Sequence, residues 1–302
     1  MASGALMLIF SFLAFYKIGG DDSGIGDLSW SGWSTAVNLF PITTVAALLV
    51  ALLAIQVAVA RFAQVNMPER VFGYSWADLR VLVGVIATVT MLGYALRSFG
   101  DITEGISKGI GLWICLLSAI GFLVGAIMER SATGASPLEG EHPRRSGPAP
   151  SDWVLIGAGV VLLVGSFLPT YSEGDESLKA WDSPFFPLYL IPVLFGVIVA
   201  VHVAVTAFSG AKVPGRVLGI DWDRIYLALG VWATFMMIGF LISHTNFVVE
   251  DFDIDDPGKG AGFWLMLLGS IAMIVGAVVR QQEGDRPAAA AAAPPPPPPP
   301  PA

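Results

Sequence analysis

Two polar side chains stand inside long apolar stretches of this chain, where they could do chemistry. His202 and Gln56 are both flanked by aliphatic residues. A histidine titrates near neutral pH, so within a membrane it can relay protons when an acidic partner lies beside it. The sequence shows no Asp or Glu at the depth of His202. We therefore expect a neutral, hydrogen-bonded histidine, with a proton relay as the alternative.

The densest charged stretch, EDFDIDDPGKG at 250–260, has acidic residues in the alternate spacing of a calcium loop. Asp256 stands where such a loop needs glycine, and Gly262 stands where it needs a bidentate glutamate. A solvated anionic loop is therefore the better interpretation. The sequence also contains no zinc-protease pair, nucleophile elbow or phosphate loop. We expect no catalytic residue, no cofactor and no metal site.

The elements that carry these residues are long and apolar. Of the 302 residues, 55% are hydrophobic and 13% are charged, whereas about a quarter are charged in a typical soluble domain. An apolar helix of roughly 17–25 residues crosses a bilayer, and in lipid a helix satisfies its own backbone. We predict an all-α membrane protein with eight transmembrane helices. They cover residues 4–18, 37–60, 77–98, 109–128, 152–170, 185–208, 223–245 and 260–280.

The first of these spans is the shortest, because Lys17 ends its apolar run. A signal peptide would need a basic stretch before it and a small-residue cleavage site after it, and the segment has neither. We expect the segment to be retained, either as a shortened helix or because translation starts further upstream.

The chain repeats itself. Residues 67–94 and 213–240 are identical at 11 of 28 aligned positions, and KGIGLWICLLSAIGFLVGA at 108–126 matches KGAGFWLMLLGSIAMIVGA at 259–277. Because each unit has an even number of spans, the second unit enters the membrane in the same orientation as the first. We predict two tandem parallel four-helix repeats, at 1–128 and 151–280. A cytoplasmic linker at 129–150 joins them, and a disordered Ala/Pro-rich cytoplasmic tail follows at 281–302.

The phrase MPERVFGYSW at 67–76 returns as VPGRVLGIDW at 213–222. We expect its prolines to end the preceding helix, its glycines to allow a turn, and its tryptophans to anchor the next helix at the membrane surface. Its arginines serve as topology determinants beside anionic lipid, with binding of a partner as the alternative. The matched connector residues are Pro68, Arg70, Gly73, Trp76, Pro214, Arg216, Gly219 and Trp222.

The charges indicate an orientation. The connectors near 61–80, 129–150, 209–224 and 280–302 hold 11 of the 16 basic residues, whereas the other connectors hold 14 of the 24 acidic residues. Basic residues concentrate on the cytoplasmic side of a membrane protein. We expect a multi-pass protein of the cell membrane with both termini in the cytoplasm.

The C-terminal tail ends in eight prolines at 294–301. Such a run forms a polyproline II rod of roughly 25 Å, with a solvated backbone. The rod could dock into an aromatic-lined groove of a cytoplasmic protein. A spacer set by genome composition is the alternative.

Three features resemble a known family. They are SFLPTY at 166–171, the acidic Gly/Ser-rich outer loops, and the helix KGIGLWICLLSAIGFLVGAIME at 108–129. In these the chain resembles the actinobacterial multi-span membrane proteins with a Pro-rich tail, typified by the mycobacterial thirty-four-kilodalton antigenic protein. It departs from that pattern in having two units and a shorter tail. The resemblance implies an integral membrane protein of the cell envelope.

Together these features favour a non-enzymatic membrane scaffold or interaction protein. The lipid bilayer and a cytoplasmic protein bound by the tail are its expected partners, and no nucleic acid is. A homo-oligomer is left open. The alternative is a small-molecule or lipid transporter built from two parallel repeats, which would need a polar stripe where the units face each other.

The orientation can be tested by cysteine labelling, since Cys115 is the only cysteine in the sequence. In a Cys115→Ser background, we expect Asp253→Cys to react with a membrane-impermeant maleimide added to intact cells. The control, Ser146→Cys in the linker, should react only after the membrane is permeabilised. Labelling of Asp253→Cys from the cytoplasmic side alone would contradict the orientation.

Overall fold

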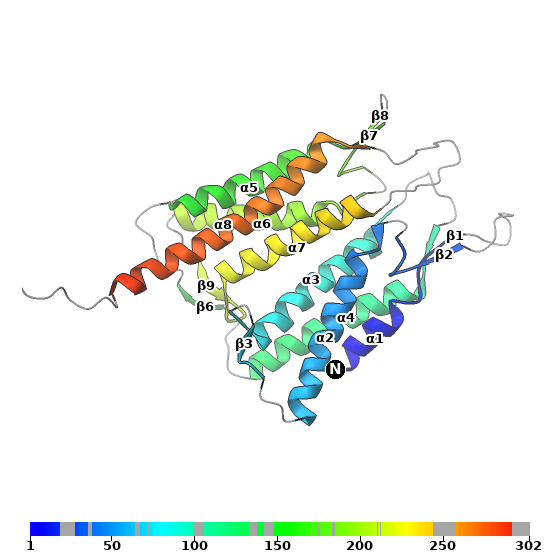
Figure 1. The fold of residues 1–302 in the computed structure, drawn as a ribbon, viewed down its shortest axis with the longest axis horizontal. Coiled ribbons are helices and arrows are strands. Elements are labelled where there is room, and N and C mark those ends of the chain that lie inside the picture. The colour runs from blue at the N-terminus through cyan, green and yellow to red at the C-terminus, as the bar shows by residue number, and fades with distance from the viewer. Residues whose placement is uncertain are drawn as a thin grey trace, which may run out of the picture.

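The computed structural model describes residues 1–18, 28–35, 38–63, 67–71, 73–98, 106–132, 138–141, 148–173, 176–182, 185–209, 211, 213–243 and 258–291. Its helices form two groups of four that contact each other (Figure 1). The first group contains α1 (Ala2–Phe10), α2 (Ile42–Phe62), α3 (Trp76–Leu96) and α4 (Ile110–Ala132). The second group contains α5 (Pro150–Phe167), α6 (Leu190–Phe208), α7 (Trp222–Ile242) and α8 (Ala261–Ala291).

In the described part of the chain, seven helices, α2 to α8, are long and apolar enough to cross a membrane. The prediction of a multi-pass, mostly helical membrane protein is therefore confirmed. The prediction of eight spanning helices is wrong in its first member, because α1 has only 9 residues. After α1 the chain turns at Ser11, whose hydroxyl donates to the Leu8 carbonyl at 2.6 Å.

The residues expected to complete the first span form a strand instead. β1 (Ala14–Ile18) pairs with β2 (Leu28–Ser31) and with β5 (Ile106–Lys108), both antiparallel. A second three-stranded sheet joins β7 (Pro169–Glu173) to β8 (Glu176–Lys179) and β11 (Gly258–Lys259). The backbone groups of β1 are satisfied by pairing with segments that are distant in the sequence. The prediction of one helix over residues 4–18 did not consider such pairing.

A glycine directly precedes both α4 and α8, and the close approach of a strand explains why. A side chain on Gly109 would place its Cβ 2.1 Å from the Ala14 carbonyl oxygen, and one on Gly260 would lie 2.3 Å from that of Pro169. Both backbone N–H groups donate to the neighbouring strand, to Phe15 at 2.7 Å and to Thr170 at 2.9 Å. Only glycine lets these two segments approach so closely.

At the opposite end, short hairpins connect the second helix of each group to the third. β3 (Arg70–Val71) pairs with β4 (Tyr74–Ser75), and β9 (Pro214–Val217) pairs with β10 (Ile220–Asp221). The linker between the groups contributes β6 (Leu138–Glu141), which pairs with β9. The sequence predicted a turn in each connector and a linker at 129–150 but no strands, because two to four residues of strand carry too little periodicity to be recognised.

The C-terminal helix is longer than expected. α8 extends to Ala291, beyond residue 280, where the second unit was predicted to end and the tail to begin. Alanine has the highest helix propensity, so the Ala run continues the helix. Figure 1 shows the end of α8 projecting beyond its neighbours. The proline run at 294–301 lies outside the described residues.

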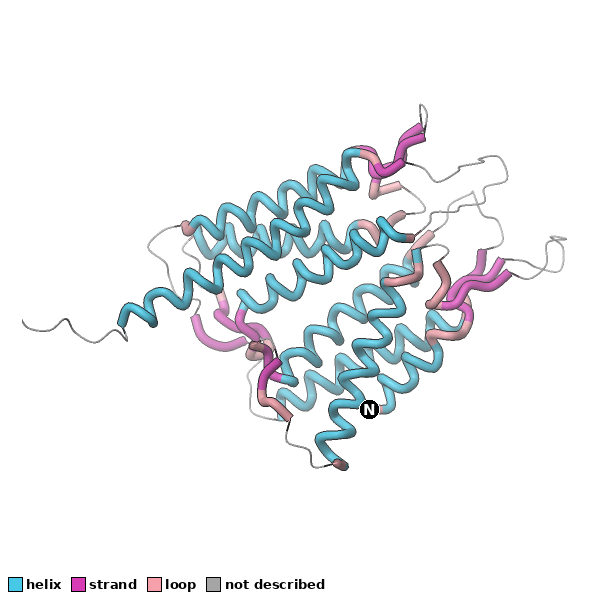
Figure 2. Tube along the Cα trace, viewed as in Figure 1, coloured by secondary structure: helices cyan, strands magenta, loops and turns pink. Residues whose placement is uncertain are grey.

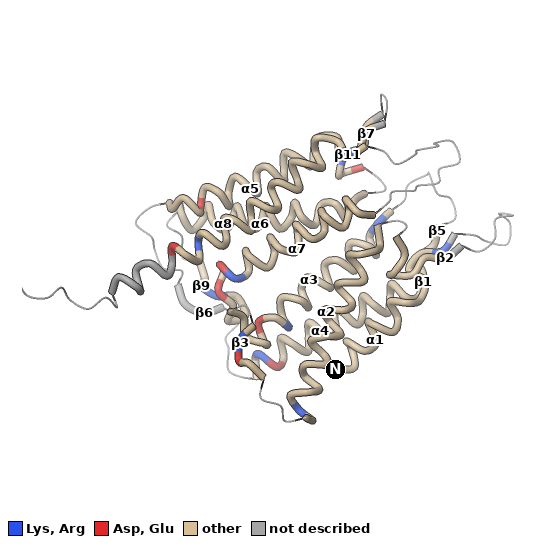
Figure 3. The backbone as a smooth tube through the Cα atoms, in the orientation of Figure 1, with Lys and Arg blue, Asp and Glu red and all other residues tan. Residues whose placement is uncertain are grey.

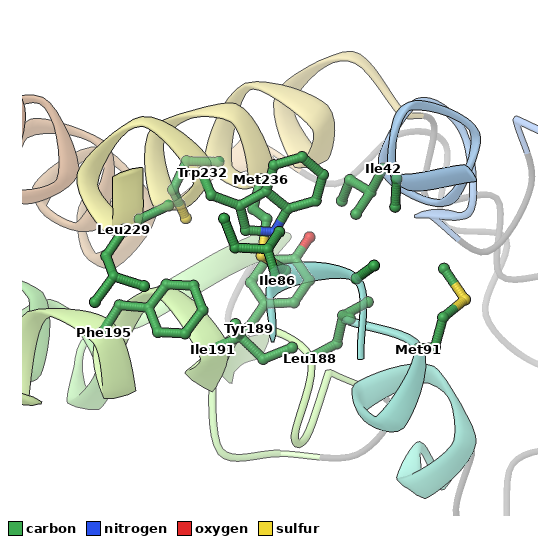
Figure 4. Packing of buried hydrophobic residues seen from close by; sticks show 14 of the residues in the cluster. Ile42, Ile86, Met91, Leu188, Tyr189, Ile191, Phe195, Leu229, Trp232 and Met236 are labelled. Atoms are coloured by element: carbon green, nitrogen blue, oxygen red, sulfur yellow. The ribbon is translucent and has the colours of Figure 1, made fainter. Parts of the chain in front are cut away.

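One hydrophobic core extends through both groups of helices. Figure 4 shows Ile42 and Met91 of the first group in the same cluster as Tyr189 and Ile191 of the second. In the middle of this contact, the Trp232 indole N–H donates to the Thr90 hydroxyl at 3.1 Å. The two groups therefore pack as one body, not as separate bundles.

A pair of glycines in α5 allows the closeness of helix packing to be tested. A Cβ on Gly159 would lie 2.5 Å from the Gly196 carbonyl oxygen in α6, whereas Gly157 has nothing within 4 Å. Because backbone cannot move aside, we expect Gly159→Ala to lower the free energy of unfolding by about 1–3 kcal/mol. The control Gly157→Ala should be neutral or stabilise by up to about 1 kcal/mol. Thermal unfolding in detergent measures both, and equal effects would contradict this packing.

Candidate functional site

Charged residues gather at the end of the molecule that carries the hairpins (Figure 3). The first of them is set by the start of α3. The Ser75 hydroxyl accepts the Asp78 backbone N–H at 3.1 Å, and the Asp78 carboxylate accepts the Ser75 N–H at 3.0 Å. This reciprocal cap satisfies two N–H groups at the helix start and holds the carboxylate in place.

Asp78 then joins the two groups of helices. Its carboxylate binds Arg130 of α4 at 2.5 Å and Arg224 of α7 at 3.2 Å. The Asp78 side chain is only 5% exposed, whereas those of Arg130 and Arg224 are 12% and 30% exposed. A carboxylate so far removed from water needs such partners to remain ionised.

Two further contacts tighten this cluster. The Tyr74 hydroxyl donates to the Arg224 carbonyl at 2.9 Å. Burial raises the pKa of Tyr74 to about 12, opposed by the nearby Arg224 charge, so the phenol stays a neutral donor. A Cβ on Gly219, whose φ is 70°, would lie 2.6 Å from the Arg130 guanidinium. The β9–β10 turn therefore packs directly on Arg130.

A second charged cluster lies within the second group of helices. Arg280 of α8 is bound by Asp152 of α5 and by Asp223 of α7, the latter at 2.6 Å. The side chains of Arg280 and Asp152 are each 3% exposed. This arginine ties three helices together at the same end of the molecule.

His202 lies beside the second cluster. Its Nδ1 is hydrogen-bonded to the Tyr226 hydroxyl, and its ring stacks on Trp222 with the centroids 3.7 Å apart. The Arg280 guanidinium lies 5.6 Å from the centre of the Tyr226 ring. The histidine is hydrogen-bonded as predicted. Asp152 and Asp223, each in the first turn of another helix, bind Arg280.

Gln56 belongs to a separate network. Its side-chain oxygen accepts from Arg80 at 3.0 Å, and Arg80 also binds Glu129 at 3.1 Å. Within the described contacts, Gln56 and His202 do not meet. They hold corresponding places in the two groups of helices without forming a common site.

The repeated connector residues form hairpins. The Trp76 indole donates to the Pro68 carbonyl at 2.8 Å, and the Trp222 indole donates to that of Pro214 at 2.9 Å. The role expected for the prolines is wrong, because α2 already ends at Phe62 and α6 at Phe208. The prolines instead open the hairpins, where their carbonyls receive the tryptophans.

The remaining connector residues shape and edge these hairpins. Gly73 and Gly219 have φ angles of 81° and 70° at the turns. Arg216 binds Asp221 across its hairpin at 2.8 Å. Arg70 is exposed and lies opposite Ser75 in the register.

The opposite end of the molecule also holds buried polar contacts between the groups. The Asn38 side-chain oxygen accepts from the Ser243 hydroxyl at 2.6 Å. Arg97, at the end of α3, is only 1% exposed. Burial raises the pKa of Tyr16, and the charge of Arg97 opposes that shift. The sequence does not single out these residues, because each stands alone at the end of an apolar run.

The same reason explains why the charged clusters were missed. Asp78, Asp152 and Asp223 are single acids in the first turn of an apolar helix, and positive-inside counting treats the arginines as topology signals. The available clue was that these acids stand close in the sequence to the arginines of the basic connectors. In the described chain, no group of three or more His, Cys, Asp or Glu side chains could hold a metal ion.

The fold and these clusters define a multi-pass helical membrane protein whose two groups of helices are joined by the Asp78–Arg224 ion pair, by hydrogen bonds and by apolar packing. In comparisons with known proteins, no family model matches the chain, and neither a curated protein nor a solved structure resembles it significantly.

The buried cluster can be compared with an exposed ion pair at the same end. Asp78→Asn leaves Arg130 and Arg224 without their carboxylate, so we expect the free energy of unfolding to fall by about 3–5 kcal/mol. Asp221→Asn removes the acid from the Arg216 pair, whose side chains are 43% and 54% exposed, and should cost about 1 kcal/mol or less. Denaturant unfolding of the purified protein measures both. Equal losses of unfolding free energy in the two variants would show that the Asp78 cluster stabilises the protein no more than an exposed ion pair does.

Proposed function

We infer that the chain is a non-enzymatic scaffold of the cell envelope, a membrane-embedded body that presents its cytoplasmic end to other proteins. The observation that carries this proposal is the closed contact between the two groups of helices. Ile191 packs against Gly93, and Ile42 packs against Gly239. A Cβ atom added to either glycine would lie 2.7 Å from the isoleucine side chain. Such interlocking favours a rigid platform over parts that slide past one another.

The proposal includes two tandem parallel repeats. It is supported by the matching order of elements in the two groups. The two outer sheets also match, because the strand that follows the first helix of each group, β1 or β7, lies at the centre of its sheet. The two hydrogen bonds from tryptophan to proline are a third likeness. The glycine contacts are also reciprocal, since Gly93 and Gly239 are equivalent in the sequence alignment. That reciprocity is expected for units related by an axis along the membrane normal. The family resemblance belongs to this proposal as well.

A transporter would need a polar route between the units. The described polar residues at this interface bind one another in three pairs, and the pairs lie at different positions along the helices. Asn38 with Ser243 lies at one end, Thr90 with Trp232 in the middle, and Asp78 with Arg224 at the other end. Apolar packing separates them, as Figure 4 shows for the central part. This arrangement favours the scaffold over the transporter.

The cytoplasmic face is proposed from the charge bias of the connectors. It is the end that carries both hairpins, the linker strand and the projecting end of α8 (Figure 1). α8 continues past its spanning part, Ala261–Glu283, to Ala291. The described part of α8 therefore ends beyond its membrane-spanning part, and the proposal assigns the Pro-rich tail that follows it in the sequence to the cytoplasmic side.

Crosslinking in native membranes tests the scaffold. We expect the full-length chain to crosslink to a reproducible set of cytoplasmic proteins, and a chain lacking residues 294–301 to lose part of that set. The reason is that a polyproline rod docks with little loss of conformational entropy.

The matched control replaces residues 294–301 with a Gly/Ser segment of equal length, which keeps the spacing and removes the rod. It should behave like the deletion. An unchanged set of crosslinked partners in both variants would overturn docking by the tail. The absence of reproducible partners for the full-length chain would overturn the scaffold.

A further inference from the structure

The two inner hairpins differ in what lies along their outer edges. β9 pairs with β10 on one side and with the linker strand β6 on the other. β3 pairs with β4, and within the described residues no strand lies on its other edge. Figure 2 draws these strands in magenta at one end of the molecule. An uncovered edge presents backbone N–H and C=O groups to which a further strand can add.

The two edges are built alike. In each hairpin a tryptophan at the start of the following helix donates to the carbonyl of the proline that opens the hairpin, at 2.8 and 2.9 Å. In each, a glycine with positive φ forms the turn. The strands are therefore held in the same way relative to the helix that follows, and β9 shows how a segment adds to such an edge.

The strand on β9 brings opposite charges into register. Glu139 of β6 lies opposite Arg216, and Leu138 lies opposite Val217. Residues directly opposite in an antiparallel pair share a face of the sheet, where opposite charges attract. In the sequence of the added strand, an acidic residue therefore stands opposite Arg216.

β3 presents related chemistry with two differences. Arg70 takes the place of Arg216, but its cross-strand neighbour is Ser75, whereas Arg216 has Asp221. Across its own hairpin, the exposed guanidinium of Arg70 therefore faces a serine and not an acid, and no ion pair of Arg70 is found among the described residues. In addition, Glu69 takes the place of Gly215, so the edge carries one charge of each sign.

We propose that β3 docks an extended segment of a cytoplasmic protein as a third strand. The segment has an apolar residue opposite Val71, an acidic residue opposite Arg70 and a basic residue opposite Glu69. The chain's own linker strand has Gly140 at the position where the basic residue is needed, so it fits β9 better than β3. This site rests on the proposed scaffold function and names the chemistry of one partner.

Peptide binding to the full-length chain in phosphatidylcholine nanodiscs tests the site. The probe is a fluorescent peptide of linker residues 134–144 with Gly140→Lys, and the readout is anisotropy. We expect saturable binding that weakens about five- to thirtyfold in Arg70→Glu, because an attractive cross-strand pair becomes a repulsive one. A second peptide, which carries Glu139→Arg as well, should bind Arg70→Glu better than it binds the wild type.

The matched control is Arg61→Glu, which makes the same charge change at the exposed end of α2 and not in a hairpin strand. It should leave the affinity within about twofold of the wild type, because exposed charges at a distance are screened. Equal losses in Arg61→Glu and Arg70→Glu, no saturable binding, or no preference of the second peptide for Arg70→Glu would each overturn the proposal. So would tighter binding of the unmodified linker peptide, which would assign the edge to the linker of a second copy.

The outcome separates this site from the scaffold function itself. If the peptide fails to bind while the full-length chain still crosslinks to cytoplasmic partners, the edge is not a docking site and the scaffold stands. If the peptide binds as expected and native membranes yield no reproducible partners, the edge accepts a strand and the scaffold function falls.

Discussion

The buried carboxylate of Asp78 constrains the structure more than any other group. It caps α3, binds Arg130 of α4 and reaches Arg224 of α7, so one side chain connects a helix start, its own group of helices and the other group. Removing a carboxylate from water is costly unless hydrogen bonds and opposite charges surround it. The hairpin turn at Gly219, which packs on Arg130, and the Tyr74 hydroxyl, which fixes the backbone at Arg224, then follow from the need to complete that environment.

Away from this cluster, close packing joins the helices. Lipid surrounds the protein with a medium as apolar as its own core, so association depends on van der Waals contact and on small residues that let backbones approach. Gly159 meets the Gly196 backbone, and Gly93 and Gly239 accept isoleucines from the other group. The same residues make the interface between the groups tight, and the proposal of a rigid platform depends on this tightness.

Much of the fold could be predicted from the sequence, and the failures have definite causes. Seven of the expected spans are helices because an apolar run in lipid has no other way to satisfy its backbone. The span at 4–18 failed because its second part pairs with strands remote in the chain. The expected role of the prolines at 68 and 214 failed because both helices end earlier, and the hairpins depend on hydrogen bonds from tryptophans that follow them.

Apolar run length, charge bias and internal repetition are local or one-dimensional properties, and by themselves they determined that this is a multi-pass helical membrane protein with two similar units. Only the tertiary structure decided which lone charges meet. Asp78 and Arg224, or Arg280 and Asp152, are far apart in the chain and unremarkable where they stand. A single charge at a helix end looks like a topology signal until folding brings an opposite charge against it and excludes water from both. The edge of β3, on which no described strand lies, became visible for the same reason, since it is recognised only by comparison with the edge of β9 that β6 covers.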